Sequence, residues 1–154
     1  MPPAISIAHA HERIYPRLLA AIDKPCSVTA ECLFVDLVAD IAVLASPDIP
    51  ELADNAAAYD RLTSAVTPLQ VSELDGEEAV AYLLPLRGSR FSCVVRAIGR
   101  GALCLEKHTK PVVGGMSGSP IFAKDGSAIG VVVTSEGPNP SLASLPGWLL
   151  AELV

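Results

Sequence analysis

The sequence is poor in charge, in aromatic rings and in long hydrophobic runs. Charged residues make up 18% of the 154 residues, whereas hydrophobic residues make up 51%, and this balance excludes a disordered chain. No apolar run approaches the roughly 20 residues that a transmembrane helix requires. The eleven Lys and Arg residues form no basic block, and the net charge is −6. We therefore expect neither nucleic acid nor a membrane as a partner.

Cysteine and histidine are also scarce. The four cysteines form no C-x-x-C pair, and no Cys/His cluster has the spacing of zinc ligands. We therefore expect no metal and no organic cofactor, and free, partly buried thiols rather than disulfides. The N-terminus lacks a basic region followed by a long apolar segment, so we expect no signal peptide and, by default, a cytoplasmic protein.

Short apolar runs separated by turn residues indicate an all-β barrel or sandwich. The Asp125-Gly126 pair between two of these runs is the strongest hairpin signal in the chain. The runs have four to eight residues and many are rich in β-branched side chains: Ala4–Ala8, Leu33–Val38, Ile41–Ala45, Ala79–Leu84, Phe91–Ile98, Ala102–Leu105, Pro120–Ala123 and Ala128–Thr134.

Three segments have helical spacing instead. Apolar residues recur at helical intervals in Tyr15–Asp23, and Pro50 suits the first turn of a helix over Pro50–Ala65. Ser144–Val154 has the apolar stripe of an amphipathic terminal helix. We also expect the segment Pro50–Pro68 to link two lobes of the chain.

The segment Val113–Phe122 carries the chemistry. Ser117 lies between glycines, and residues without Cβ let backbone N–H groups point at one spot. Two such amides, those of Gly115 and Ser117, could stabilise the oxyanion of an acyl-transfer reaction. The hydroxyl would also need a neighbouring base, which is usually a histidine oriented by a carboxylate.

The order of residues along the chain limits the kind of hydrolase. All three histidines precede Ser117, which excludes an α/β-hydrolase because that fold needs a histidine after the serine. An order of Asp, His and Ser would need His108, only nine residues before the serine. The order of His, Asp and Ser remains, with His9 or His11 as the base.

Three blocks of the sequence resemble the trypsin-like (chymotrypsin-fold) serine peptidases, especially their bacterial members. The blocks are Gly115-Met116-Ser117-Gly118-Ser119-Pro120, Val35–Leu44 and Ile5-Ser6-Ile7-Ala8-His9-Ala10. The resemblance implies Ser117 as the nucleophile, His9 as the base and Asp40 as the residue that orients it. Because Asp40 lies within an apolar strand pattern, we expect its carboxylate to be buried or paired.

The resemblance also implies the fold and the substrate. It implies two antiparallel β-barrels of the chymotrypsin type with a C-terminal helix, residues 1–65 forming the first lobe with its linker helix and residues 66–154 the second. The site would lie between the lobes and cut a polypeptide through an acyl-enzyme. The residues implied for the pocket beside the cut are Pro111, Val133, Thr134 and Ser135. Pro111 stands where an Asp would select Lys or Arg, so that preference is not expected.

The sequence departs from the family pattern before His9. The family has two strands ahead of the histidine strand, whereas this chain has about eight residues there, so we expect an incomplete first barrel. Its open strand edges would favour self-association. Two other functions stay open: an inactive peptidase-fold module that binds a peptide or protein partner, and a hydrolase of small esters.

Overall fold

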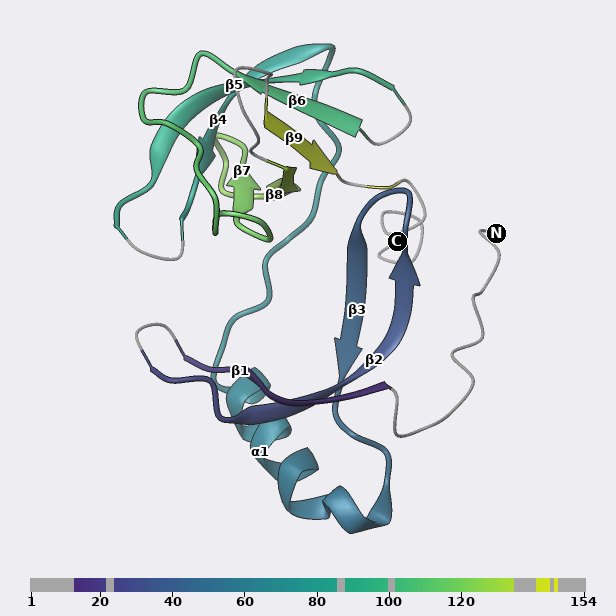
Figure 1. The fold of residues 1–154 in the computed structure, drawn as a ribbon. Helices are drawn as coiled ribbons and strands as arrows, with labels where there is room; N and C mark the ends of the chain where they lie inside the picture. Colours follow the sequence, from purple (N-terminus) through teal and green to yellow (C-terminus); the bar gives the residue numbers. More distant parts are fainter. Residues whose placement is uncertain are drawn as a thin grey trace. The chain divides into compact units, whose positions relative to one another are not determined.

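Nine strands and one α-helix make up the part of the chain that the computed structural model describes, namely residues 13–21, 24–85, 88–99, 102–134, 141–144 and 146 (Figure 1). The chain divides into two units, Met1–Pro68 and Leu69–Val154, so the division falls after Pro68 rather than after residue 65. None of the described helices is long and apolar enough to cross a membrane.

The first unit is built on a three-stranded antiparallel sheet in the order β1-β2-β3. Its strands are β1 (Ile14–Leu19), β2 (Val28–Asp36) and β3 (Ile41–Ala45). A 3-10 turn, η2 (Pro50–Leu52), then leads into α1 (Ala53–Ser64). The apolar runs at β2 and β3 were predicted as strands, and the structure confirms both.

The helix predicted over Tyr15–Asp23 is wrong, because residues 14–19 form β1 instead. The strand pairs with β2 at Ile14↔Glu31 and Leu19↔Val28, and the register shifts between these pairs. Leu18, one of the residues that suggested a helical stripe, is 41% exposed. The spacing therefore did not mark a buried helix face, and pairing with β2 decided the local structure.

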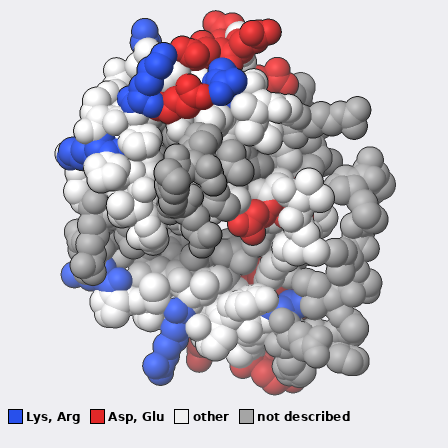
Figure 2. Space-filling model, turned by 45° about the horizontal axis from the view of Figure 1, so that its top comes forward, with Lys and Arg blue, Asp and Glu red and all other residues white. Residues whose placement is uncertain are grey.

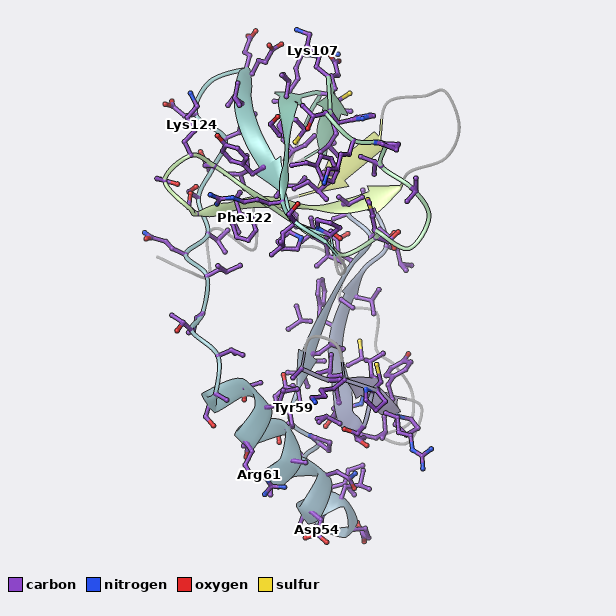
Figure 3. All side chains as sticks on the ribbon, turned by 90° about the vertical axis from the view of Figure 1, so that its left-hand side faces the viewer. Asp54, Tyr59, Arg61, Lys107, Phe122 and Lys124 are labelled. Atoms are coloured by element: carbon purple, nitrogen blue, oxygen red, sulfur yellow. The ribbon has the colours of Figure 1, made fainter. Side chains whose placement is uncertain are left out.

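The helix predicted over Pro50–Ala65 is confirmed over Ala53–Ser64, and Pro50 begins the 3-10 turn η2 that precedes it. Figure 3 shows Tyr59 on the side of α1 that faces the sheet, and its hydroxyl donates a hydrogen bond to the carbonyl oxygen of Leu44 at 3.1 Å. The Asn55 amide donates to the hydroxyl of Thr29 at 3.1 Å. The helix is therefore part of the first unit, and the exposed residues 65–70 lead from it along the chain to the second unit.

The second unit is a six-stranded antiparallel barrel in the order β4-β5-β6-β9-β8-β7 (Figure 1). Two residue pairs between β4 and β7, Tyr82↔Phe122 and Leu83↔Ile121, close the ring, so its seam is narrow. The strands are β4 (Glu78–Leu83), β5 (Phe91–Ala97), β6 (Ala102–Glu106), β7 (Pro120–Phe122), β8 (Ala128–Thr134) and β9 (Ser141–Ser144).

Alternation along the strands explains the core of the barrel. Successive side chains of a strand point to opposite faces, so every second residue of β5 faces inward. Phe91, Cys93 and Val95 are accordingly buried. They join a cluster that also contains Ala81, Leu83, Leu103, Leu105, Ile121, Ile129, Val132 and Ala143.

The hairpin predicted at Asp125-Gly126 is confirmed between β7 and β8. Gly126 has φ +93°, a conformation that glycine adopts without strain, and its N–H donates to the carbonyl oxygen of Ala123 at 3.1 Å. One carboxylate oxygen of Asp125 accepts from the backbone N–H of Ser127 at 2.9 Å and from its hydroxyl at 2.7 Å. These bonds lower the pKa of Asp125 from its usual range.

The predicted fold class is therefore confirmed in its coarser form, a largely β chain with two antiparallel sheets. One sheet closes into a barrel, whereas the described part of the first unit contains three strands and no closed ring. Strand β9 was not predicted. The predicted strand Ala4–Ala8 and residues 147–154 of the predicted terminal helix lie outside the described residues.

Candidate active site

Ser117 lies in the second of two consecutive turns, in the segment between β6 and β7. The N–H of Met116 donates to the carbonyl oxygen of Val113 at 3.2 Å, and the N–H of Ser119 donates to that of Met116 at 3.0 Å. The two four-residue turns therefore share Met116. Ser117 is the second residue of the second turn, and its side chain is exposed.

The glycines at positions 115 and 118 follow from this geometry. Each is the third residue of its turn, and their φ angles are +88° and +80°. A positive φ at the third position is the mark of a type II turn, which glycine adopts without the strain that a Cβ would cause. The glycine spacing that singled out Ser117 in the sequence thus has a direct backbone reason.

Strand β8 holds the second turn in place. The N–H of Gly118 donates to the carbonyl oxygen of Val132 at 2.7 Å, and the N–H of Val132 donates to that of Ser119 at 3.0 Å. The Ser117 hydroxyl donates to the carbonyl oxygen of Val133 at 3.2 Å. Ser119 is buried, whereas Ser117 is exposed to solvent, so the turn is held at its buried end and presents Ser117 at the surface.

Amides beside Ser117 remain open in the double turn. The N–H groups of Gly114, Gly115 and Ser117 have no hydrogen-bond partner among the residues that the structure describes. Within the described part of the chain, no atom beyond the adjacent residues lies within 4 Å of where a Cβ on Gly114, Gly115 or Gly118 would be. The two amides predicted to hold an oxyanion, those of Gly115 and Ser117, are therefore available to an acceptor.

Asp40 is placed differently from the expectation. It ends the turn between β2 and β3, with φ +53°, and its side chain is exposed rather than buried. A carboxylate oxygen of Asp36 organises this turn by accepting from the N–H groups of Val38 at 2.9 Å and Ala39 at 3.0 Å. The apolar pattern around Asp40 reflects the two strands that the turn joins, and not burial of the turn itself.

Of the other predicted site residues, some belong to the described part of the chain and some do not. Pro111 is exposed in the segment that leads into the double turn, and Val133 lies half-buried in β8 next to the terminal Thr134. His9, His11 and Ser135 lie outside the described residues. The structure therefore brings Ser117, Gly115 and Val133 together within the second unit, while Asp40 belongs to the first.

The segment of the sequence around Ser117 contains no acidic residue. Residues 107–124 contain no Asp or Glu, although the whole protein has a net charge of −6. The preceding carboxylate, Glu106, is paired with Arg96, and the Arg96 guanidinium holds the pKa of Glu106 below its usual range. Figure 2 likewise shows Lys and Arg side chains among Asp and Glu side chains at the upper margin of the view.

An acidic groove in the second unit was missed by the sequence analysis. It has a volume of about 630 Å³, and its walls include Glu73, Asp75, Glu78 and Asp125 with Lys124 as the cation. The acidic run at residues 73–78 was the available signal. No lining residue belongs to the double turn, and no group of three or more His, Cys, Asp or Glu among the described residues could hold a metal ion.

Comparison with known proteins adds no relative. No protein-family model matches the chain, and no curated protein matches it.

Proposed function

We propose that the protein is a serine endopeptidase that cuts peptide bonds through an acyl-enzyme on Ser117. The observation that carries the proposal is the double turn, where an exposed hydroxyl adjoins the open amides of Gly115 and Ser117. Acyl transfer needs a nucleophile beside donors that can receive the developing oxyanion. This loop contains both, and backbone hydrogen bonds to β8 hold it in position.

The proposed reaction uses His9 and Asp40 from the first unit. Ser117 Oγ attacks the scissile carbonyl carbon while His9 accepts the hydroxyl proton. The carbonyl oxygen becomes an oxyanion that accepts hydrogen bonds from the two amides. Collapse breaks the C–N bond as His9 gives the proton to the leaving amine, and a water activated by His9 then releases the acid and regenerates Ser117.

The architecture supports this assignment in outline. A trypsin-like peptidase would carry its nucleophile in a second antiparallel barrel and its aspartate at the start of a strand in the first lobe. Ser117 lies between β6 and β7 of a six-stranded barrel, and Asp40 lies directly before β3. The aspartate of a catalytic triad is buried against its histidine, so the exposed Asp40 supports the proposal by its place in the chain and not by its burial.

The proposed pocket beside the cut takes an uncharged side chain. Its candidate residues are Pro111, Val133, Thr134 and Ser135, and none of them is charged. A pocket without a carboxylate gives no charge partner to Lys or Arg. We therefore expect peptide substrates with uncharged residues before the cut.

An inactive module that binds a peptide is the second candidate, and one contact favours it. The Ser117 hydroxyl donates to the carbonyl oxygen of Val133, so its proton is directed to β8 and not to a base. A serine held this way can still bind a ligand through the neighbouring amides. This module would bind its partner without cutting it.

Labelling with a fluorophosphonate tests the two candidates. We expect one adduct per molecule by intact mass, and we expect Ser117→Ala and His9→Ala to abolish it. Ser89→Ala is the matched control, because Ser89 is also an exposed serine of the second unit. An adduct that survives His9→Ala but is lost in His11→Ala would assign the base to His11.

Failure to form any adduct in the folded wild-type protein would reject the peptidase proposal in favour of the binding module. Turnover of esters without turnover of peptides in the same preparation would reject it in favour of the esterase. Both results are informative only with folded protein, which the dispersion of amide resonances from the barrel can establish.

A further inference from the structure

The double turn also has the properties of a site for a stable anion. A run of open N–H groups in a turn forms a concavity that binds anions. The amides of Gly114, Gly115 and Ser117 are open within the described part of the chain, and the exposed Ser117 hydroxyl lies beside them. The site therefore offers several neutral donors on one short segment.

The segment that carries the turn has no negative side chain to repel an anion. Residues 107–124 contain no carboxylate, while Lys107 lies 4.0 Å from Glu78 and Lys124 lines the acidic groove, so neither lysine is assigned to the turn. Residues 107–124 therefore present no negative side chain to an anion that approaches the double turn. The ammonium of Lys110 is directed to the hydroxyl of Ser89, at 3.4 Å, and the Ser117 hydroxyl donates to Val133, so the open donors at the turn itself are backbone amides.

Neutral donors suit a carboxylate better than a phosphate. Backbone amides also bind phosphate, but Arg or Lys commonly balances its higher charge, and no described contact brings such a group to the turn. A carboxylate presents two acceptor oxygens in a plane and carries a single charge. Among the described residues, nothing fills the space beside Gly114, Gly115 and Gly118, which leaves room for the end of a chain that carries this group.

We propose that the double turn binds peptides by their free C-terminal carboxylate, as a stable ligand and not only as a transient oxyanion. The inference rests on the same amides as the proposed function. Its consequence for a peptidase is that the acyl product, which ends in a carboxylate, competes with substrate. Its consequence for a binding module is that the partner is recognised by its C-terminus.

Binding to the full-length Ser117→Ala protein tests the inference without cleavage. The probes are acetyl-Ala-Ala-Ala-Xaa peptides, with Ala, Leu, Phe, Lys or Glu as Xaa, each as the free acid and as the carboxamide. We expect the acid to bind at least about tenfold more tightly than the amide, because a carboxamide replaces a charged acceptor oxygen with a donor. The amide resonances of positions 115 and 117 should shift with the acid.

Two glycine variants in the Ser117→Ala background locate the site. Gly115→Ala strains a backbone with φ +88° and should remove the preference for the acid. Gly126→Ala imposes the same kind of strain at φ +93° in the β7–β8 hairpin and should leave the preference intact. Unchanged amide resonances from the barrel core establish that both variants fold.

Equal affinity for acid and amide, no binding by either, or shifts at other residues would overturn the inference. Acetate serves as the small-anion arm: if it alone shifts the two amides and peptide acids bind no better, the site takes free anions and not peptide ends. A wild-type phosphonate adduct without acid preference would leave the proposed function standing. A preference for the acid without a phosphonate adduct would support the carboxylate site and reject the proposed peptidase function.

Discussion

The four cysteines illustrate how position decides the chemistry of one residue type. Cys26 is exposed, whereas Cys32, Cys93 and Cys104 are buried free thiols. Burial raises the pKa of Cys93 to about 11. Burial and a hydrogen bond to Glu106 also raise the pKa of Cys104 above its usual value. Since the thiolate is the reactive form, the buried thiols of the barrel should be inert.

We expect one thiol per folded molecule to react quickly with a disulfide reagent at pH 8, and all four after unfolding in urea. Cys26→Ser should remove the fast reaction. Because the pKa of Cys93 is raised from 9.0 to about 11, its contribution to folding is fully present below about pH 9. That contribution is lost as the pH rises towards 11. A second fast thiol at pH 8 would contradict the structure.

At the scale of elements, the sheet of the first unit depends on a buried carboxylate of β2. Glu31 is only 3% exposed. One of its carboxylate oxygens contacts the Arg13 guanidinium at 3.1 Å, and the other accepts from the backbone N–H of Asp48 at 3.0 Å. Glu31 thus connects the start of the described chain to the segment before η2.

Glu31→Ala should lower the free energy of unfolding by about 2–4 kcal/mol, because it leaves a partly buried guanidinium and a backbone N–H without their acceptor. Glu51→Ala is the control, since Glu51 is exposed and should change stability by no more than about 0.5 kcal/mol. Urea unfolding of the two variants measures the difference. Equal midpoints would show that the carboxylate contributes nothing.

The edges of the same sheet bear on the predicted self-association. In β1, Pro16 has no N–H to donate, and Arg17 has φ +54° where the pairing is irregular. On β3, the carbonyl oxygen of Leu44 already accepts from Tyr59 of α1. Natural proteins use such features to prevent pairing between edges. Self-association through these strands therefore remains a prediction with little structural support.

At the scale of the whole molecule, the described hydrophobic cluster and the connecting segment can be assigned to parts of the chain. The main hydrophobic cluster consists of residues from the second unit, between Ala81 and Ala143. The connecting residues 65–70 are exposed, including Val66 at 59% and Leu69 at 51%. The hydrogen bonds that fasten the chain to the barrel begin at Gln70, whose carbonyl oxygen accepts from the N–H of Ala128 at 2.8 Å.

We expect a protease that cuts before bulky apolar residues to nick the native protein first at Val66 or Leu69. If His9 and Asp40 act on Ser117, the nick should slow phosphonate labelling once the fragments separate, while the barrel amides stay dispersed. A Val66→Gly, Leu69→Gly variant should resist the nick and keep its labelling rate. First cuts within β4–β8 would contradict the described connection.

Local sequence patterns predicted the elements whose pairing partners are close along the chain. Asp125-Gly126 specified the β7–β8 hairpin because the conformation of a hairpin turn depends on the residues of the turn itself. The glycines around Ser117 specified the turn for the same reason. The prediction for Tyr15–Asp23 failed although its partner β2 follows directly in the chain, since its apolar spacing suits a helix and no Asp-Gly or Asn-Gly pair marks the connection to β2.

By itself, the sequence determined a largely β protein, helix α1 and a glycine-bordered serine, because alternation, Pro50 and the need for positive φ act within a few residues. Only the tertiary structure decided that β4 and β7 close the barrel, that Asp40 is exposed and that the amides beside Ser117 are open. Those features depend on which distant groups meet. Hydrogen-bond partners and burial are properties of the assembled chain, and no local pattern encodes them.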